Sequence, residues 1–141
     1  MTGFRSPQAF LKIGGAVLVL VGVLGFFLIG PTADSSIFGS AWVFTMAENW
    51  AHLILGIVAL IAAGALKDHG QAKGLVIVVG LVALLVGILG FFSSLGSILQ
   101  NPLDNILHLI VGIWALWAAM GGGASAPAAP SAPTPPQQPV A

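Results

Sequence analysis

Two stretches decide the fold of this chain: residues 48–63, ENWAHLILGIVALIAA, and residues 104–119, DNILHLIVGIWALWAA. They share the pattern N-x-x-H-L-I-x-G-I-x-A-L-x-A-A. Each follows a related apolar stretch, VLVGVLGFF at 19–27 and LLVGILGFF at 84–92. Because the order of the two elements is the same in both copies, we interpret the chain as a tandem repeat of one two-element unit.

The composition indicates that most of this chain is surrounded by lipid. Hydrophobic residues make up 57% of the sequence and charged residues only 6%, whereas roughly 25% of a soluble domain is charged. A net charge of zero argues against nucleic acid as a partner. The absence of cysteine excludes disulfides, thiolate metal sites and cysteine nucleophiles.

Four apolar stretches approach the ~20 residues that a helix needs to cross a bilayer. They predict transmembrane helices over residues 9–29, 46–66, 74–92 and 103–120. We therefore expect an all-α integral membrane domain over 1–120. Its four helices form two tandem two-helix repeats, which a pseudo-two-fold axis along the membrane normal relates. Residues 121–141 are rich in proline and alanine and predict a disordered tail.

Local signals predict where three of these helices begin or end. Thr45 and Glu48 have the spacing of a capping box at the start of the second helix. Residues 67–70, KDHG, predict a polar turn after it, and His69 in that turn is expected to be solvated. Asn101 and Pro102 resemble an N-cap followed by proline at the first position of the fourth helix.

Basic residues predict the orientation in the membrane. Arg5 and Lys12 precede the first helix, and Lys67 and Lys73 flank the turn between the second and third. The other loops contain no lysine or arginine, so the positive-inside rule places both termini in the cytoplasm of a multi-pass plasma-membrane protein. The loop between the first two helices looks short, and we expect no additional site in it.

Small residues recur on one side of the helices and predict close helix packing in a compact bundle. In the second helix His52, Gly56, Ala59 and Ala63 share one face, and the fourth helix repeats this pattern. Small residues on one stripe let two helix backbones approach closely. The predicted packing glycines are Gly15, Gly22, Gly56, Gly80, Gly87 and Gly112.

Each repeat carries a carboxylate, an asparagine and a histidine within little more than one helical turn. The two sets are Glu48, Asn49 and His52, then Asp104, Asn105 and His108. Carboxylate and histidine are four residues apart and close enough to pair. Ionisable residues inside a membrane usually face the interior of a bundle. We therefore expect both sets at similar depth in the bundle interior.

Three hypotheses account for these polar sets. In the first they are structural, with the histidines bonded to a backbone carbonyl or to the carboxylate. In the second His52 and His108 ligate a haem or a (bacterio)chlorophyll-type pigment, and the carboxylates orient the imidazoles. In the third they belong to a proton or ion pathway. Zinc would require three or four ligands and therefore tightly converging helices, so we assign no metal ligand.

The double N-x-x-H-L signature resembles a bacterial membrane family, the domain of unknown function 4383. The similarity covers residues 9–120, nearly everything except the tail. It implies four spanning helices and a bacterial plasma membrane, and it supplies no activity. The signature positions here are Asn49, His52, Leu53 and Gly56, and Asn105, His108, Leu109 and Gly112.

No catalytic motif is recognisable, so we predict that the protein is not an enzyme. The leading hypothesis is a structural or accessory subunit that packs in a larger membrane complex or in a homo-oligomer. The alternative is a haem-binding or pigment-binding membrane protein, and a pathway component ranks third. In each case the lipid bilayer is the expected surrounding.

Overall fold

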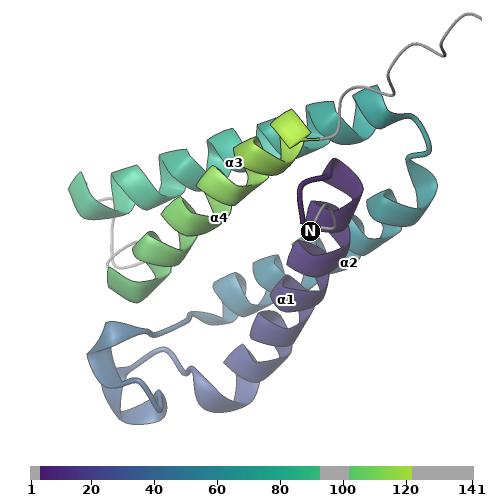
Figure 1. The fold of residues 1–141 in the computed structure, drawn as a ribbon. Helices are drawn as coiled ribbons and strands as arrows, with labels where there is room; N and C mark the ends of the chain where they lie inside the picture. Colours follow the sequence, from purple (N-terminus) through teal and green to yellow (C-terminus); the bar gives the residue numbers. More distant parts are fainter. Residues whose placement is uncertain (1–3, 93–101, 122–141) are drawn as a thin grey trace, which may run out of the picture.

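The computed structural model describes residues 4–92 and 102–121 and contains four α-helices in that part of the chain. They are α1 (Pro7–Leu28), α2 (Met46–Ala65), α3 (His69–Phe92) and α4 (Pro102–Gly121). All four are long and apolar enough to cross a membrane. The predicted fold class is confirmed, and the chain is a multi-pass membrane protein of two helical hairpins (Figure 1).

Helix boundaries follow local capping, and one of them corrects the sequence prediction. The predicted capping box of α2 is present, because Thr45 and Glu48 bond each other's backbone N–H groups. Helix α3 begins at His69 rather than at residue 74, because the Asp68 carboxylate accepts a hydrogen bond from Gln71 N at 2.8 Å. His69 therefore lies in the first turn of α3 and not in a solvated turn.

The other predicted boundaries agree with the structure where it describes them. Helix α4 begins at Pro102, as the sequence indicates. Asn101, the predicted N-cap, and the tail from residue 122 lie outside the described residues.

Backbone-to-backbone packing at glycines holds each hairpin together. A Cβ built at Gly22 of α1 would lie 2.6 Å from the backbone nitrogen of Leu53 in α2. One built at Gly87 of α3 would lie 2.9 Å from the backbone oxygen of Asn105 in α4. Since real Cβ atoms do not tolerate such distances, side chains here would force the helices apart.

The remaining predicted packing glycines meet in pairs inside the hairpins. A Cβ at Gly15 would lie 3.0 Å from the Gly56 carbonyl oxygen, and one at Gly80 would lie 3.2 Å from that of Gly112. The repeat in the sequence is thus a repeat of the same helix contact.

The two hairpins touch each other much less than the helices within each hairpin. Their contacts come mainly from α1 against α3 and α4. The buried core is formed by Phe10 and Leu11 of α1, Ala72 and Val76 of α3, and the last turns of α4. This cluster lies toward the end of the molecule that carries the α2–α3 turn, here called the turn end. Figure 1 shows the turn. Ile29 and Phe44 are buried separately, at the opposite end. The helix contacts fit the predicted four-helix bundle, and the two hairpins are its tighter units.

The α1–α2 loop lies at the opposite end, here called the loop end. It contains two short 3-10 helices, η1 (Ala33–Ser35) and η2 (Gly39–Ala41). Ile29 and Ser36 form an isolated bridge across the loop, and Phe44 N donates to the carbonyl oxygen of Gly30 at 3.1 Å. These bonds give the loop a defined path back to α2.

Candidate ligand site between the two hairpins

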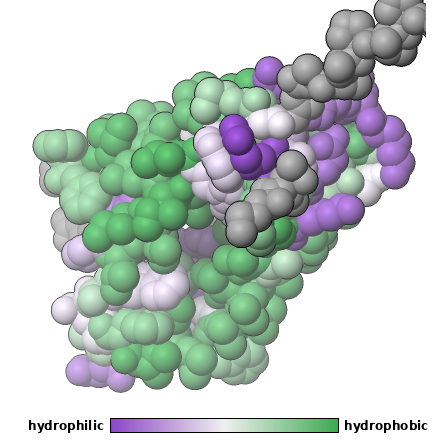
Figure 2. Space-filling view, in the orientation of Figure 1, coloured by the Kyte–Doolittle hydropathy of each residue, from purple (hydrophilic) through white to green (hydrophobic). Residues whose placement is uncertain are grey.

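An open-sided cavity of about 570 Å³ lies between the two hairpins. All four helices contribute to its walls, and Figure 2 shows a recess between the hairpins on the face in view. Its volume falls within the range of about 300–1,000 Å³ that is typical of small-molecule sites.

The cavity is elongated and polar at one end only. Its wall on α2 runs from Glu48 to Ala59 and its wall on α4 from Asp104 to Trp114. At 1.5 Å per residue these walls are about 15–17 Å long, or about half of a ~30 Å hydrocarbon core. The ionisable side chains among the described lining residues are Glu48, His52, Asp104 and His108, all at the loop end.

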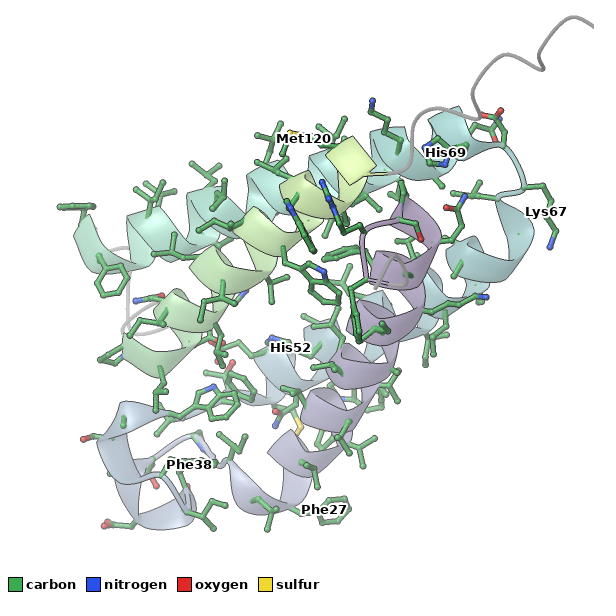
Figure 3. The ribbon with its side chains drawn as sticks, in the orientation of Figure 1. Phe27, Phe38, His52, Lys67, His69 and Met120 are labelled. Atoms are coloured by element: carbon green, nitrogen blue, oxygen red, sulfur yellow. The ribbon has the colours of Figure 1, made fainter. Side chains whose placement is uncertain are left out.

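His52 lies one turn into α2 and is held from two sides. Its Nδ1 is 2.7 Å from the carbonyl oxygen of Glu48. The ring of Phe44 stacks on its imidazole, with centroids 4.8 Å apart and planes at 24°. Figure 3 shows His52 where the two hairpins face each other. The α1–α2 loop thus covers the site on its outer side, contrary to the expectation that this loop adds nothing.

His108 occupies the equivalent position on α4. Its Nδ1 is 2.8 Å from the carbonyl oxygen of Asp104 and 3.2 Å from the carboxylate oxygen Oδ2 of the same residue. The Asp104 side chain is buried. The carboxylate–histidine pair predicted from the spacing is therefore present in the second repeat.

The first repeat uses its carboxylate differently. Glu48 Oε2 accepts hydrogen bonds from Thr45 N at 2.6 Å and from Thr45 Oγ1 at 2.7 Å. It therefore caps α2 instead of pairing with His52. The histidine has the same position in both repeats, but the carboxylate has a different partner: Thr45 for Glu48 and His108 for Asp104.

These hydrogen bonds assign the tautomer of both histidines. A carbonyl oxygen can only accept, so Nδ1 carries the proton in His52 and His108. In the neutral rings the lone pair then lies on Nε2. Each histidine therefore offers one acceptor or metal-ligating nitrogen.

The histidines of the two hairpins come together at the polar end of the cavity. The centroids of the His52 and His108 rings are 6.2 Å apart. One potential ligand atom from each of His52, Asp104 and His108 lies within 4.8 Å of the others. Of the four ionisable side chains predicted in the polar sets, these three therefore come nearly as close together as a metal site needs.

The two asparagines lie in the interior, as expected, but away from the cavity. Asn49 and Asn105 are buried, but neither lines the cavity. A Cβ on Gly25 would collide with the amide of Asn49, and one on Gly90 with that of Asn105. The asparagines therefore pack between the helices of each hairpin. Gly25 and Gly90 occupy matching places in the two repeats, so comparison of the repeats carries the signal for this contact.

Sequence reasoning also missed two aromatic residues of the site. Trp42 lines the polar end of the cavity, and its ring lies 5.5 Å from that of Phe44. The Nε1–H of Trp42 is buried without a hydrogen-bond partner among the described residues. No local sequence pattern shows that a loop folds over a helix start, so the sequence gives no signal for this contact.

Comparison with family models, curated proteins and solved structures found no match. The resemblance to the domain of unknown function 4383 therefore stays a prediction.

Proposed function

We propose that this membrane protein binds a small amphiphile with an elongated apolar body and a hydroxyl head group in the cavity between its hairpins. The observation that carries the proposal is the one-sided polarity of the cavity. Its loop end gathers two histidines and two carboxylates, and the rest of its wall is apolar. Sites for small molecules commonly combine an apolar wall with a few convergent polar groups.

The head group follows from the hydrogen-bonding capacity of the polar end. The Nε2 atoms of His52 and His108 are acceptors, since their Nδ1 atoms already donate to carbonyl oxygens. A hydroxyl donates a hydrogen bond, so it complements an imidazole Nε2 that can only accept one.

The apolar body follows from the wall and its length. Along α2 the cavity is lined by Leu55, Val58 and Ala59 beyond the histidine, and Trp114 with Phe10 closes the far end. The contacts between the hairpins are few, so an apolar molecule can enter from the bilayer between them. A chain about 15 Å long lies along this wall within one leaflet of the bilayer.

A haem or chlorophyll-type pigment fits the same cavity less well. A macrocycle ligated by both His52 and His108 is flat, and within its plane it extends equally on all sides of its metal. The cavity extends from the histidines toward the turn end, while Phe44 stacks on His52 from the loop end. The separation of the two rings suits a metal between them, but the space around them is one-sided.

The other two hypotheses remain predictions. A proton pathway needs ionisable groups or water along its length, and beyond the polar end the described wall residues are apolar. A structural or accessory subunit is compatible with the many apolar side chains that the helices expose. That hypothesis does not account for a cavity with polar groups at one end.

The test uses brominated alkanols, because bromine quenches tryptophan fluorescence on contact. Trp42 lies at the polar end of the cavity and Trp114 at the far end. In a background with Trp50→Phe and Trp117→Phe, reconstituted in phosphatidylcholine vesicles, we expect saturable quenching. An alkanol brominated beside the hydroxyl should quench Trp42, and one brominated at the tail should quench Trp114.

Two neighbouring residues of α2 provide a matched pair of variants. Val58 lines the cavity and Ile57 does not, although both are exposed in the monomer, at 52% and 45%. Val58→Phe should weaken alkanol binding by about fivefold or more, because an overfilled cavity commonly loses 1–3 kcal/mol. Ile57→Phe should leave binding unchanged. Linear, unsaturable quenching that is the same in both variants would contradict the proposal.

A further inference from the structure

We infer that His52, Asp104 and His108 form a site for a divalent transition-metal ion at the loop end of the cavity. This inference does not depend on the proposed function, because the metal needs only the polar end of the cavity. The ion and a hydroxyl head group would compete for the same Nε2 lone pairs of His52 and His108. Two imidazoles and one carboxylate are a ligand set that zinc and other first-row divalent ions accept. The three residues come from two different hairpins, so the metal would join the halves of the molecule.

The side chains are close to the spacing that a metal requires, when either ring nitrogen of each histidine is counted as the ligand atom. One potential ligand atom from each side chain lies within 4.8 Å of the others. Bonds of about 2.1 Å in a tetrahedral site place ligand atoms about 3.4 Å apart. The widest pair must therefore close by roughly 1.4 Å. The contacts between the hairpins are few, so the inference requires that the side chains and hairpins shift by this amount when the ion binds.

The second ring nitrogen of each histidine is already engaged in the way that metal sites use. His52 Nδ1 donates to the Glu48 carbonyl oxygen and His108 Nδ1 to that of Asp104. Such bonds orient the imidazole and leave the Nε2 lone pair for the metal. Each ring is therefore prepared by its own helix before any ion binds.

The charges at the polar end match a divalent cation. Asp104 is 5% exposed, and a buried carboxylate needs a positive partner or several hydrogen bonds. Glu48 lines the same end of the cavity. No lysine or arginine lines the cavity among the described residues. One divalent ion would balance the two carboxylates and leave a coordination position open toward the cavity.

The first measurement is a calorimetric titration of the full chain with Zn²⁺. The protein is purified in mild detergent through a histidine-free tag and is treated with a chelator. We expect one equivalent of Zn²⁺ per chain. Binding should also raise the thermal unfolding midpoint in proportion to the logarithm of Zn²⁺ concentration, and the chelator should reverse the shift.

Variants then identify the ligands. Asp104→Asn preserves the size of the side chain and removes its charge, and His52→Gln removes one imidazole. Each should weaken Zn²⁺ binding at least about tenfold. His69→Gln is the matched control, since His69 lies at the start of α3 outside the cluster, and it should bind as the wild type does.

Several outcomes would overturn the inference. These are the absence of a stoichiometric heat in the wild type, an unfolding midpoint that does not respond to Zn²⁺, and equal weakening by His69→Gln. The last would indicate surface binding. If a variant of the cluster fails to fold, the response of the wild-type unfolding midpoint to Zn²⁺ still tests the inference. A protein that binds Zn²⁺ but no alkanol would refute the proposed function and leave this inference standing.

Discussion

At the scale of single residues, the carboxylates of the two repeats have different roles. Glu48 is one methylene longer than Asp104 and has Thr45 as a hydrogen-bond partner. Glu48 reaches back to Thr45 and satisfies the orphan N–H groups at the start of α2. Asp104 contacts His108 on the same helix. The histidines are therefore equivalent in position, but only His108 has a carboxylate within hydrogen-bonding distance of its ring among the described residues.

The capping box makes a prediction at this scale. Thr45→Ala removes the side chain that bonds both Glu48 N and Glu48 Oε2. We expect a loss of about 1 kcal/mol, within a range of about 0.5–2, in the free energy of unfolding. The measurement is unfolding in mixed micelles followed by circular dichroism. Thr32→Ala, at the exposed cap of η1, should cost less, and equal losses would argue against a special role for the α2 cap.

At the scale of elements, each hairpin is built on glycines where two helix backbones touch. The closest approaches lie on α1 at Gly22 and on α2 at Gly56, and the second hairpin repeats them on α3 and α4. The same stripe that packs α2 on α1 carries His52 to the edge of the hairpin. The packing of the hairpin therefore determines where the histidine can point.

Glycine substitutions test this packing directly. A Cβ at Gly22 would meet backbone atoms of Leu53, whereas nothing lies within 4 Å of one at Gly64 on the same hairpin. Gly22→Ala should destabilise the protein by about 1–3 kcal/mol. Gly64→Ala should be neutral or stabilise it by up to about 1 kcal/mol, because alanine favours helix. Mixed-micelle unfolding measures both, and a Gly22→Ala protein as stable as the wild type would show that α1 and α2 are not in close contact.

At the scale of the whole molecule, charge divides the two ends. Arg5 and Lys12 lie near the start of α1, and Lys73 lies in the first turns of α3. Lys67 lies in the α2–α3 turn (Figure 3). The loop end carries Asp34 and no basic residue among those described. The positive-inside rule thus predicts that the turn end faces the cytoplasm and the polar end of the cavity lies toward the outside.

Thiol labelling tests this orientation, because the chain has no cysteine of its own. Ser40→Cys places a thiol in the exposed α1–α2 loop, and Gln71→Cys places one at the exposed start of α3. In intact cells a membrane-impermeant maleimide should label Ser40→Cys. It should label Gln71→Cys only after lysis. The reverse pattern would mean that the polar end of the cavity faces the cytoplasm.

The sequence by itself determined the four helices, their order and most of their ends, and the packing glycines. These features depend on hydropathy, on the 3.6-residue period and on caps within a few residues of each other, so they are local. The repeat added the equivalence of His52 and His108, because similar helices place similar residues at similar depth.

Only the tertiary structure decided what the polar residues do. It separated Asn49 and Asn105, which pack inside the hairpins, from His52, Asp104 and His108, which meet between them. It also placed Phe44 on His52 and opened the cavity. These features depend on how the two hairpins pack against each other through few contacts. They also depend on how the α1–α2 loop folds back over the start of α2. Such long-range packing leaves no periodic trace in the sequence, because the residues that meet are far apart along the chain.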